Sequence, residues 1–132
     1  MIFLDSSALV KRYVREHHSD WLVALMDEDL QWTACAVAAV ETRVTLCATF
    51  ADAERRDHAQ LKFDADWASV VVVGVDDYIL TRAGEIGCRF ATRTLDSIHL
   101  AAAERLPAGL TVVTFDGRQA AAARTLGFTV AP

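Results

Sequence analysis

The chain has 132 residues, of which 53% are hydrophobic and 23% charged, and its formal net charge is −5 at pH 7. These values are typical of a single folded domain over residues 1–132 and exclude an intrinsically disordered chain. The negative charge argues against a general nucleic-acid-binding protein, but it does not exclude an enzyme that acts on nucleic acid.

The sequence contains no apolar run of the length that spans a bilayer, and the run from Val70 to Val75 has the length of a strand. The amino-terminal segment lacks the basic and apolar regions of a signal peptide. Three cysteines, with no C-x-x-C pair, indicate neither disulfides nor a zinc site. We therefore expect a cytoplasmic protein with no membrane partner.

Short apolar runs alternate with longer helical patterns along the chain, as in a parallel β-sheet flanked by helices. Strands are predicted at residues 2–5, 32–34, 70–74, 110–114 and 128–130. Helices are predicted at residues 6–15, 18–29, 35–51, 52–68, 76–88, 95–106 and 117–126. The predicted fold class is α/β, a single-domain α/β/α sandwich with right-handed crossovers.

Four acidic residues at or near these apolar segments are candidate site residues: Asp5, Glu41, Asp96 and Asp116. Asp5 follows the first strand and Asp116 the fourth, and the carboxyl ends of parallel strands meet at one edge of a sheet, where ligands bind. Two carboxylates ~4 Å apart repel by about 4 kcal/mol at an effective dielectric constant of about 20. Four together would take up protons or a hard cation, and all-oxygen ligands favour Mg²⁺ or Mn²⁺ over Zn²⁺.

Each acid also has an ordinary structural interpretation. Asp5 could cap the following helix, although Ser6 or Ser7 could do so instead and leave Asp5 free. Asp116 could form a turn or cap the last helix, and Asp96 lies in a first turn, where the helix dipole favours acids. Asp76 and Asp77, which also follow a strand, are assigned only the start of a helix.

Glu41 is the most unusual of the four, because its helical neighbours Val37, Val44 and Ala48 are apolar. A carboxylate on an apolar stripe is costly unless it is paired or bound to a metal. The alternative is that the helix turns Glu41 and Arg43 toward water.

His99 stands one turn beyond Asp96, within hydrogen-bonding reach, and we interpret it as a structural partner of that acid rather than as a general base. Ser6 and Thr114 are hydroxyl residues beside candidate ligands, well placed to orient a carboxylate or a phosphate.

These residues resemble the PIN domain family, and within it the VapC-type toxins of bacterial toxin–antitoxin pairs. The likeness covers essentially the whole chain and rests on apolar residues before Asp5-Ser6-Ser7, a mid-helix Glu41, the segment from Thr94 to Ala103, and the ending that starts at Thr114-Phe115-Asp116-Gly117. It implies a five-stranded parallel sheet in the order 3-2-1-4-5. It also implies an Mg²⁺-dependent endoribonuclease with an RNA substrate, a cognate antitoxin protein and a homodimeric assembly.

Under this resemblance, Asp5, Glu41, Asp96 and Asp116 match the family's acidic metal ligands, and Ser6 and Thr114 match its supporting hydroxyls. Asp5 and Asp116 would bind the metal directly or through water, while Glu41 and Asp96 would complete the shell or position a metal-activated water. The expected products carry 5′-phosphate and 3′-hydroxyl ends. Some members have a further acid after the fourth, which Gly117-Arg118-Gln119 lacks, so a second metal site is in question.

Other readings of the sequence stay open. The chain could be an RNA-processing PIN nuclease outside a toxin–antitoxin pair, or a non-catalytic binding module on the same fold. A phosphatase would want an acid at Ser7, and a receiver domain would want a lysine beyond Lys62, so both are disfavoured. The candidates for contact with RNA phosphates are Lys11, Arg12, Arg15, Arg43 and Arg93.

Overall fold

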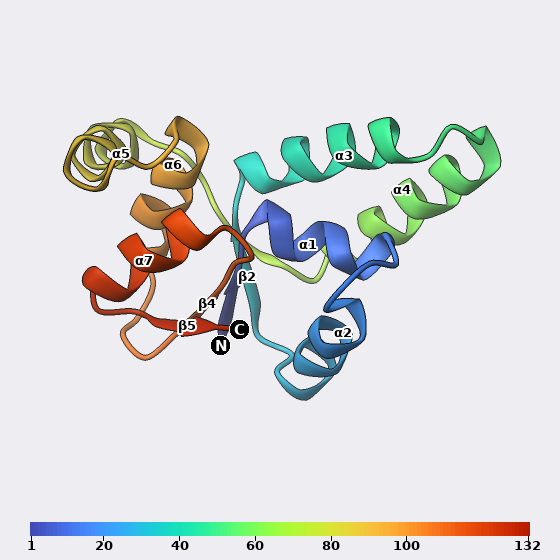
Figure 1. The fold of residues 1–132 in the computed structure, drawn as a ribbon, viewed down its shortest axis with the longest axis horizontal. Coiled ribbons are helices and arrows are strands. Elements are labelled where there is room, and N and C mark those ends of the chain that lie inside the picture. Colours follow the sequence, from blue (N-terminus) through green and yellow to red (C-terminus); the bar gives the residue numbers. More distant parts are fainter.

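The computed structural model describes residues 1–132 and contains one five-stranded sheet surrounded by seven helices (Figure 1). The strands are β1 (Ile2–Leu4), β2 (Trp32–Cys35), β3 (Val71–Val73), β4 (Thr111–Val113) and β5 (Thr129–Ala131). The helices are α1 (Ser6–Tyr13), α2 (Ser19–Glu28), α3 (Val37–Thr49), α4 (Ala53–Trp67), α5 (Asp77–Phe90), α6 (Thr94–Ala103) and α7 (Gly117–Thr125).

All neighbouring strands pair in parallel, in the order β3-β2-β1-β4-β5. The predicted fold class and strand order are therefore confirmed. The order reverses at β1, which lies between β2 and β4, and this reversal is where ligands bind in open α/β sheets.

The two faces of the sheet carry separate cores because successive strand residues point in opposite directions. Ile2 and Leu4 face α1 and α2 in one apolar cluster, whereas Phe3 faces α5, α6 and α7 in the other. Figure 1 shows the strands between these two groups of helices. A third, small cluster of Leu46, Ala59 and Phe63 joins α3 to α4.

Helix starts follow the acidic residues in the sequence. Asp52 caps α4 and Asp76 caps α5, each accepting a hydrogen bond from a backbone amide of the first turn. The assignment of Asp76 and Asp77 to a helix start is thus confirmed. Gly127, at φ 94°, follows α7 in the left-handed conformation that ends a helix.

Element boundaries differ from the predicted ones by at most three residues. The largest difference is at α6, which ends at Ala103 rather than at residue 106. Arg105 and Leu106 donate instead to the carbonyls three residues back, Ala102 and Ala103, so the chain leaves the helix in a tighter turn. None of the helices combines the length and the apolar composition that a bilayer crossing demands.

Candidate functional site

Asp5 lies directly after β1 and begins α1. Its Oδ1 accepts the Ala8 amide at 2.8 Å, so Asp5 is the helix cap and neither serine replaces it. Its Oδ2 accepts the Thr114 hydroxyl at 2.8 Å, which ties β1 to the end of β4. Burial raises the pKa of Asp5, opposed by the charge of His99 and by the hydrogen bonds it accepts. An ionised Asp5 therefore favours a cation beside it.

The hydroxyl that orients Asp5 from its own helix is Ser7, not Ser6. Ser7 Oγ lies 2.8 Å from Asp5 Oδ1 and 3.0 Å from Oδ2, and it accepts the Phe115 amide at 2.9 Å. Ser6 lines the same pocket without a hydrogen bond from its side chain. Ser6 was predicted to support the acids, but its side chain makes no such contact. Ser7, the next residue of the helix, is the one that faces β4.

Thr114 and Gln119 form a buried chain that ends at Asp5. Thr114 Oγ1 lies 2.7 Å from the Gln119 side-chain amide and accepts the Asp116 amide at 3.1 Å. A hydroxyl has one proton, and Thr114 gives it to Asp5, so Gln119 must supply a donor. Turning the Gln119 amide places Nε2, otherwise without a partner, against Thr114 Oγ1. Thr114 thus supports Asp5 as predicted, and Gln119 is a positioning residue that the sequence did not reveal.

Asp116 and Asp96 are joined by Arg93. Asp116 caps α7 by accepting the amides of Arg118 and Gln119 at Oδ1, at 2.9 and 2.8 Å. Arg93 donates from Nε to Asp96 Oδ2 at 2.8 Å and from Nη2 to Asp116 Oδ2 at 2.9 Å. The hydrogen bond that Arg93 donates to Asp96, with the charges of Asp96, Asp116 and Glu41, raises the pKa of Arg93. The guanidinium is therefore a permanent cation among the acids.

Glu41 is paired with His99 rather than left on an apolar stripe. His99 Nε2 lies 2.6 Å from Glu41 Oε2, and the ring is 1% exposed against Phe3. The expected contact between His99 and Asp96 is wrong, because α6 turns His99 toward α3. The apolar stripe is also not a buried one, since Val44 is 62% exposed.

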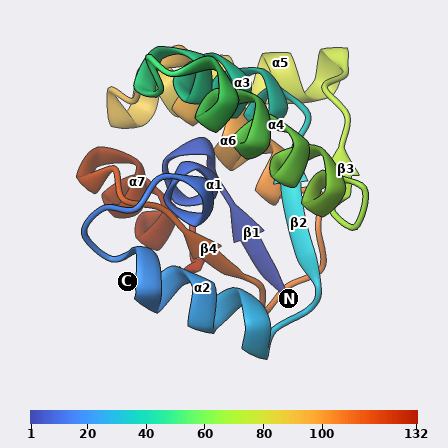
Figure 2. The same ribbon diagram turned by 90° about the vertical axis from the view of Figure 1, so that its right-hand side faces the viewer.

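One pocket of about 320 Å³ gathers the four acids from four distant segments, and Arg93, Ser6 and Ser7 line it too. The first turns of α1 and α7, which carry Asp5 and Asp116, lie side by side at this end of the sheet (Figure 2). No three of the acids are close enough to bind one ion directly in this arrangement. The four acids therefore share one pocket, and their binding of a shared ion stays a prediction.

The donor set nevertheless fits a hard divalent cation. Its ligating atoms are carboxylate and hydroxyl oxygens without cysteine, and Mg²⁺ commonly keeps several waters between itself and such ligands. Burial raises the pKa of Asp5, and a cation beside the carboxylate would stabilise its ionised form.

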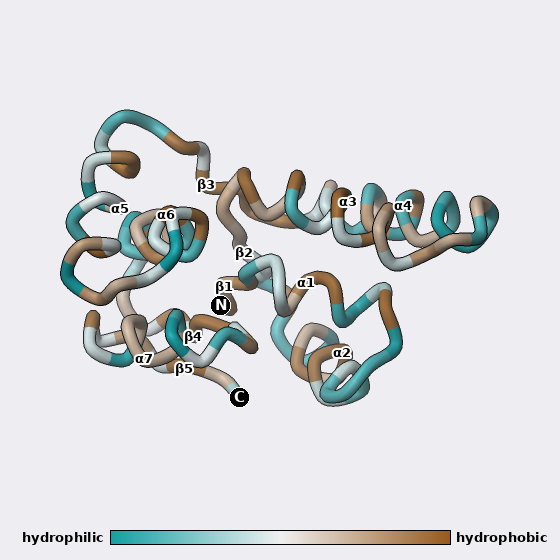
Figure 3. The backbone as a smooth tube through the Cα atoms, turned by 45° about the horizontal axis from the view of Figure 1, so that its top comes forward, coloured by the Kyte–Doolittle hydropathy of each residue, from teal (hydrophilic) through white to brown (hydrophobic).

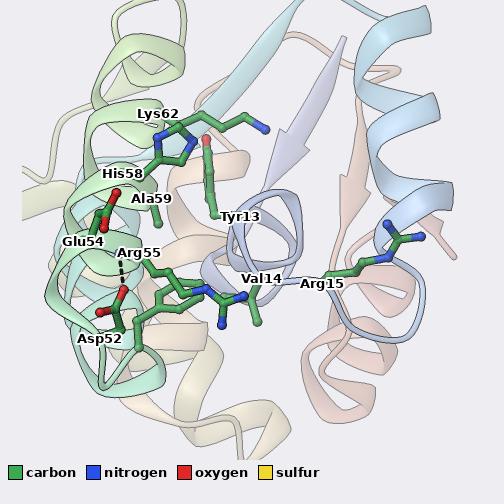
Figure 4. Close-up of a pocket in the computed structure, with 10 residues that line it drawn as sticks. Tyr13, Val14, Arg15, Asp52, Glu54, Arg55, His58, Ala59 and Lys62 are labelled. Carbon is green, nitrogen blue, oxygen red and sulfur yellow. Dashed lines mark hydrogen bonds between the residues drawn. The ribbon is translucent and has the colours of Figure 1, made fainter.

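A larger hollow of about 1050 Å³ lies elsewhere, between the end of α1 and the side of α4 (Figure 4). None of the four acids lines it. Its walls carry Arg15, Arg55, His58 and Lys62, of which only Arg15 has an acidic neighbour within 4.0 Å, Asp20 at 3.8 Å. Asp52 and Glu54 line the hollow too, so it carries both charges with a basic excess, whereas acids predominate in the carboxylate pocket.

Comparison with known proteins places the chain among related sequences and folds. A model of the PIN domain family matches residues 2–125. Ribonuclease VapC46 of Mycobacterium tuberculosis is 37% identical over 130 residues, which are 98% of this chain and 95% of that protein. Ribonuclease VapC49 of the same organism is 29% identical over 138 residues, covering 100% of this chain and 95% of its own.

Solved structures share the fold at low identity. The VapC20 toxin of Mycobacterium tuberculosis, described as cleaving the sarcin-ricin loop, superposes with a TM-score of 0.77 at 17% identity over 98% of this chain and 97% of its own. A FitAcB structure from Neisseria gonorrhoeae gives a TM-score of 0.72 at 19% identity over 100% and 97% of the two chains.

Proposed function

Because the chain belongs to the PIN domain family, we propose that it is a divalent-metal-dependent endoribonuclease and the toxin of a bacterial toxin–antitoxin pair. The observation that carries the proposal is the pocket in which Asp5, Glu41, Asp96 and Asp116 meet although they are remote in sequence. The names of the related mycobacterial ribonucleases support the same activity. A cytoplasmic location and a single domain over residues 1–132 remain our predictions.

Mg²⁺ is the metal we expect, with Mn²⁺ as a substitute, and Asp5, Asp96, Asp116 and Glu41 would hold it. When bound, such an ion lowers the pKa of a coordinated water and offsets charge on the phosphate. The chain itself fixes Asp5 through Ser7 and Thr114, fixes Asp116 through its helix cap, and fixes Glu41 through His99. These contacts hold the carboxylates in place without help from the substrate.

Cleavage of a labelled RNA by the purified protein tests the activity. We expect cleavage in Mg²⁺ that Asp5→Asn lowers roughly 100-fold or more, in the range found when a charge-stabilising group is removed from an active site. Asp52→Asn is the matched control, since Asp52 also caps a helix but lies outside the carboxylate pocket. Equal cleavage by the wild-type protein and Asp5→Asn would refute the assignment.

Induction of the gene in bacteria tests the toxin role separately. A toxin arrests growth, and the arrest should disappear with Asp5→Asn. An RNA-processing nuclease would cleave RNA in the test tube without arresting growth.

A cognate antitoxin is the partner we expect, and structural neighbours described as toxin–antitoxin complexes support it. We place part of its contact at the hollow of Figure 4, where Arg55 and Lys62 project from α4 without ion-pair partners and, together with Arg15, exceed the neighbouring acids. In a chain of net charge −5, such a cluster suits an acidic segment of a protein partner. Charge reversal at Arg55 and Lys62 should weaken antitoxin capture at least tenfold and leave RNA cleavage by the free protein unchanged. Undiminished capture would remove the hollow from the interface.

A homodimer is the assembly we propose. Val40 and Val44 form an exposed apolar pair on α3, 64% and 62% exposed, and Figure 3 shows hydrophobic stretches along this helix. Light scattering after gel filtration should give twice the chain mass for the wild-type protein and the chain mass for Val44→Glu. A wild-type monomer at 100 μM, roughly the upper range of such measurements, would contradict the proposal.

A further inference from the structure

Arg93 has a position that the proposed activity does not explain. It lines the carboxylate pocket, its side chain is 69% exposed, and it precedes α6 by one residue without capping it. Both of its side-chain hydrogen bonds go to candidate metal ligands, Asp96 and Asp116. Arg93 is exposed enough to extend into water, yet its side chain lies across the pocket and bonds to two acids.

The oxygens that Arg93 contacts are the ones that a metal ion needs. Asp116 uses Oδ1 for two amides of α7, which leaves Oδ2 as its oxygen free of helix capping, and Arg93 occupies it. Asp96 likewise meets Arg93 through Oδ2. The guanidinium therefore bridges two carboxylates in the place where a bridging cation would neutralise them.

We propose that Arg93 is an internal counter-cation, exchanged for the divalent ion when the ion binds. The proposal rests on the proposed function in taking the pocket as the metal site. It explains why the four acids share one pocket while no three approach one point: with the guanidinium between Asp96 and Asp116, the pocket cannot contract. Binding of the ion to these two Oδ2 atoms requires both hydrogen bonds of Arg93 to break.

The exchange has a cost and a benefit that follow from charge. A fixed cation competes with the ion for the same oxygens, so it weakens metal binding. Without it, mutual repulsion of the carboxylates would destabilise the pocket before an ion arrives. Once released, the flexible and exposed side chain stands at the pocket mouth, where its planar fork suits an incoming phosphate. Arg93 is in this sense a positioning residue whose partner changes from carboxylate to phosphate.

Arg118 provides the matched control. It borders Asp116 as Arg93 does, but its side chain donates to the Ala91 carbonyl at 3.4 Å and to no acid. Removing Arg118 subtracts the same charge from the neighbourhood without freeing a carboxylate oxygen. Arg93→Lys is the second comparison, since it keeps the charge and loses the two-armed bridge.

The test measures Mn²⁺ binding by calorimetry and by electron paramagnetic resonance, with no RNA present. We expect Arg93→Ala to bind Mn²⁺ about five- to tenfold more tightly than the wild-type protein, Arg93→Lys to lie between them, and Arg118→Ala to stay within twofold of wild type. Equal or weaker binding by Arg93→Ala would overturn the exchange. If the wild-type protein binds no Mn²⁺, binding by Arg93→Ala alone supports the proposal and absence of binding in both overturns it.

A second readout follows the side chain itself. The Nε–H signal of Arg93 in a ¹⁵N spectrum, assigned by its absence in Arg93→Ala, should shift on titration with Mg²⁺ while that of Arg118 stays in place. An unmoved Arg93 signal at saturating Mg²⁺ would also overturn the proposal. RNA cleavage by the wild-type protein, measured in parallel, decides the proposed function separately, because neither binding readout depends on RNA hydrolysis.

Discussion

His99 Nε2 lies 2.6 Å from Glu41 Oε2, a contact that joins α6 to α3 across 58 positions of the chain. His99 is almost fully buried, whereas Glu41 is partly exposed and reaches the carboxylate pocket. The buried His99 thus holds Glu41 in place from inside the protein. We assign the stabilising role to His99 and the chemical role to Glu41.

We predict that His99→Ala destabilises the fold by about 2–4 kcal/mol, since it removes a buried ring and the partner of Glu41. Urea denaturation followed by circular dichroism measures this loss. His58→Ala, on the exposed side of α4, should change stability by less than about 0.5 kcal/mol. Glu41→Gln should retain near-native stability and lose RNA cleavage, and the opposite pattern would refute the division of roles.

The two serines after Asp5 should differ sharply. Ser7→Ala removes the hydroxyl that contacts both Asp5 oxygens and accepts the Phe115 amide, and we expect a loss of about 1–3 kcal/mol. Ser6→Ala removes no hydrogen bond from the fold, so its effect on stability should lie within about 0.5 kcal/mol. Denaturation curves for the two variants decide between them. Equal losses would show that Ser7 does not have the position described.

Asp5 gives a prediction about pH. Burial raises the pKa of its carboxyl above the unfolded value of about 3.9, so the folded protein keeps this proton over a range where the unfolded chain has released it. The contribution of Asp5 to stability therefore falls as pH rises through that range and stays low above it. In EDTA, Asp5→Asn should gain stability relative to wild type as pH rises above the unfolded pKa of about 3.9. A difference that does not change with pH would contradict the buried, strained carboxylate.

Metal removal should abolish RNA cleavage and metal addition should stabilise the fold. EDTA is expected to stop cleavage, and excess Mg²⁺ or Mn²⁺ to restore it. An ion at 100 times its dissociation constant stabilises the protein that binds it by about 2.7 kcal/mol. Thermal denaturation should show this rise for the wild-type protein and not for Asp5→Asn. Cleavage that survives EDTA would exclude the metal mechanism.

Strand and helix positions could be anticipated because apolar runs, caps and glycine have local signatures, whereas the strand order followed only from the resemblance to the PIN domain family. Asp76, Asp116 and Gly127 begin or end helices where the sequence indicates. The end of α6 was placed three residues too late, because residues 104–106 suit a helix in composition, although Pro107 disfavours helix at the residue before it.

The site was predictable in its acids and not in its connections. Asp5 and Asp116 follow strands, and that signal is visible in one dimension. Whether Ser6 or Ser7 faces β4, and whether His99 meets Asp96 or Glu41, depends on how far each helix is rotated about its axis. Gln119 gave no signal, since a lone glutamine among alanines is ordinary in a surface helix. The role of Arg93 needs the distance from Asp96 to Asp116, which spacing alone does not supply.

Asp5 and Asp116 each use one oxygen for a helix start, and the other oxygen accepts a side-chain donor, Thr114 for Asp5 and Arg93 for Asp116. Their side-chain torsions are therefore set when the backbone folds, and an arriving ion has little rotational freedom left to remove. The side-chain entropy of these two acids is therefore lost on folding rather than on ion binding. A homologue that lost either cap would need additional ligands to bind the same ion equally well. Loss of a helix cap and loss of ion affinity are therefore expected to occur together in evolution.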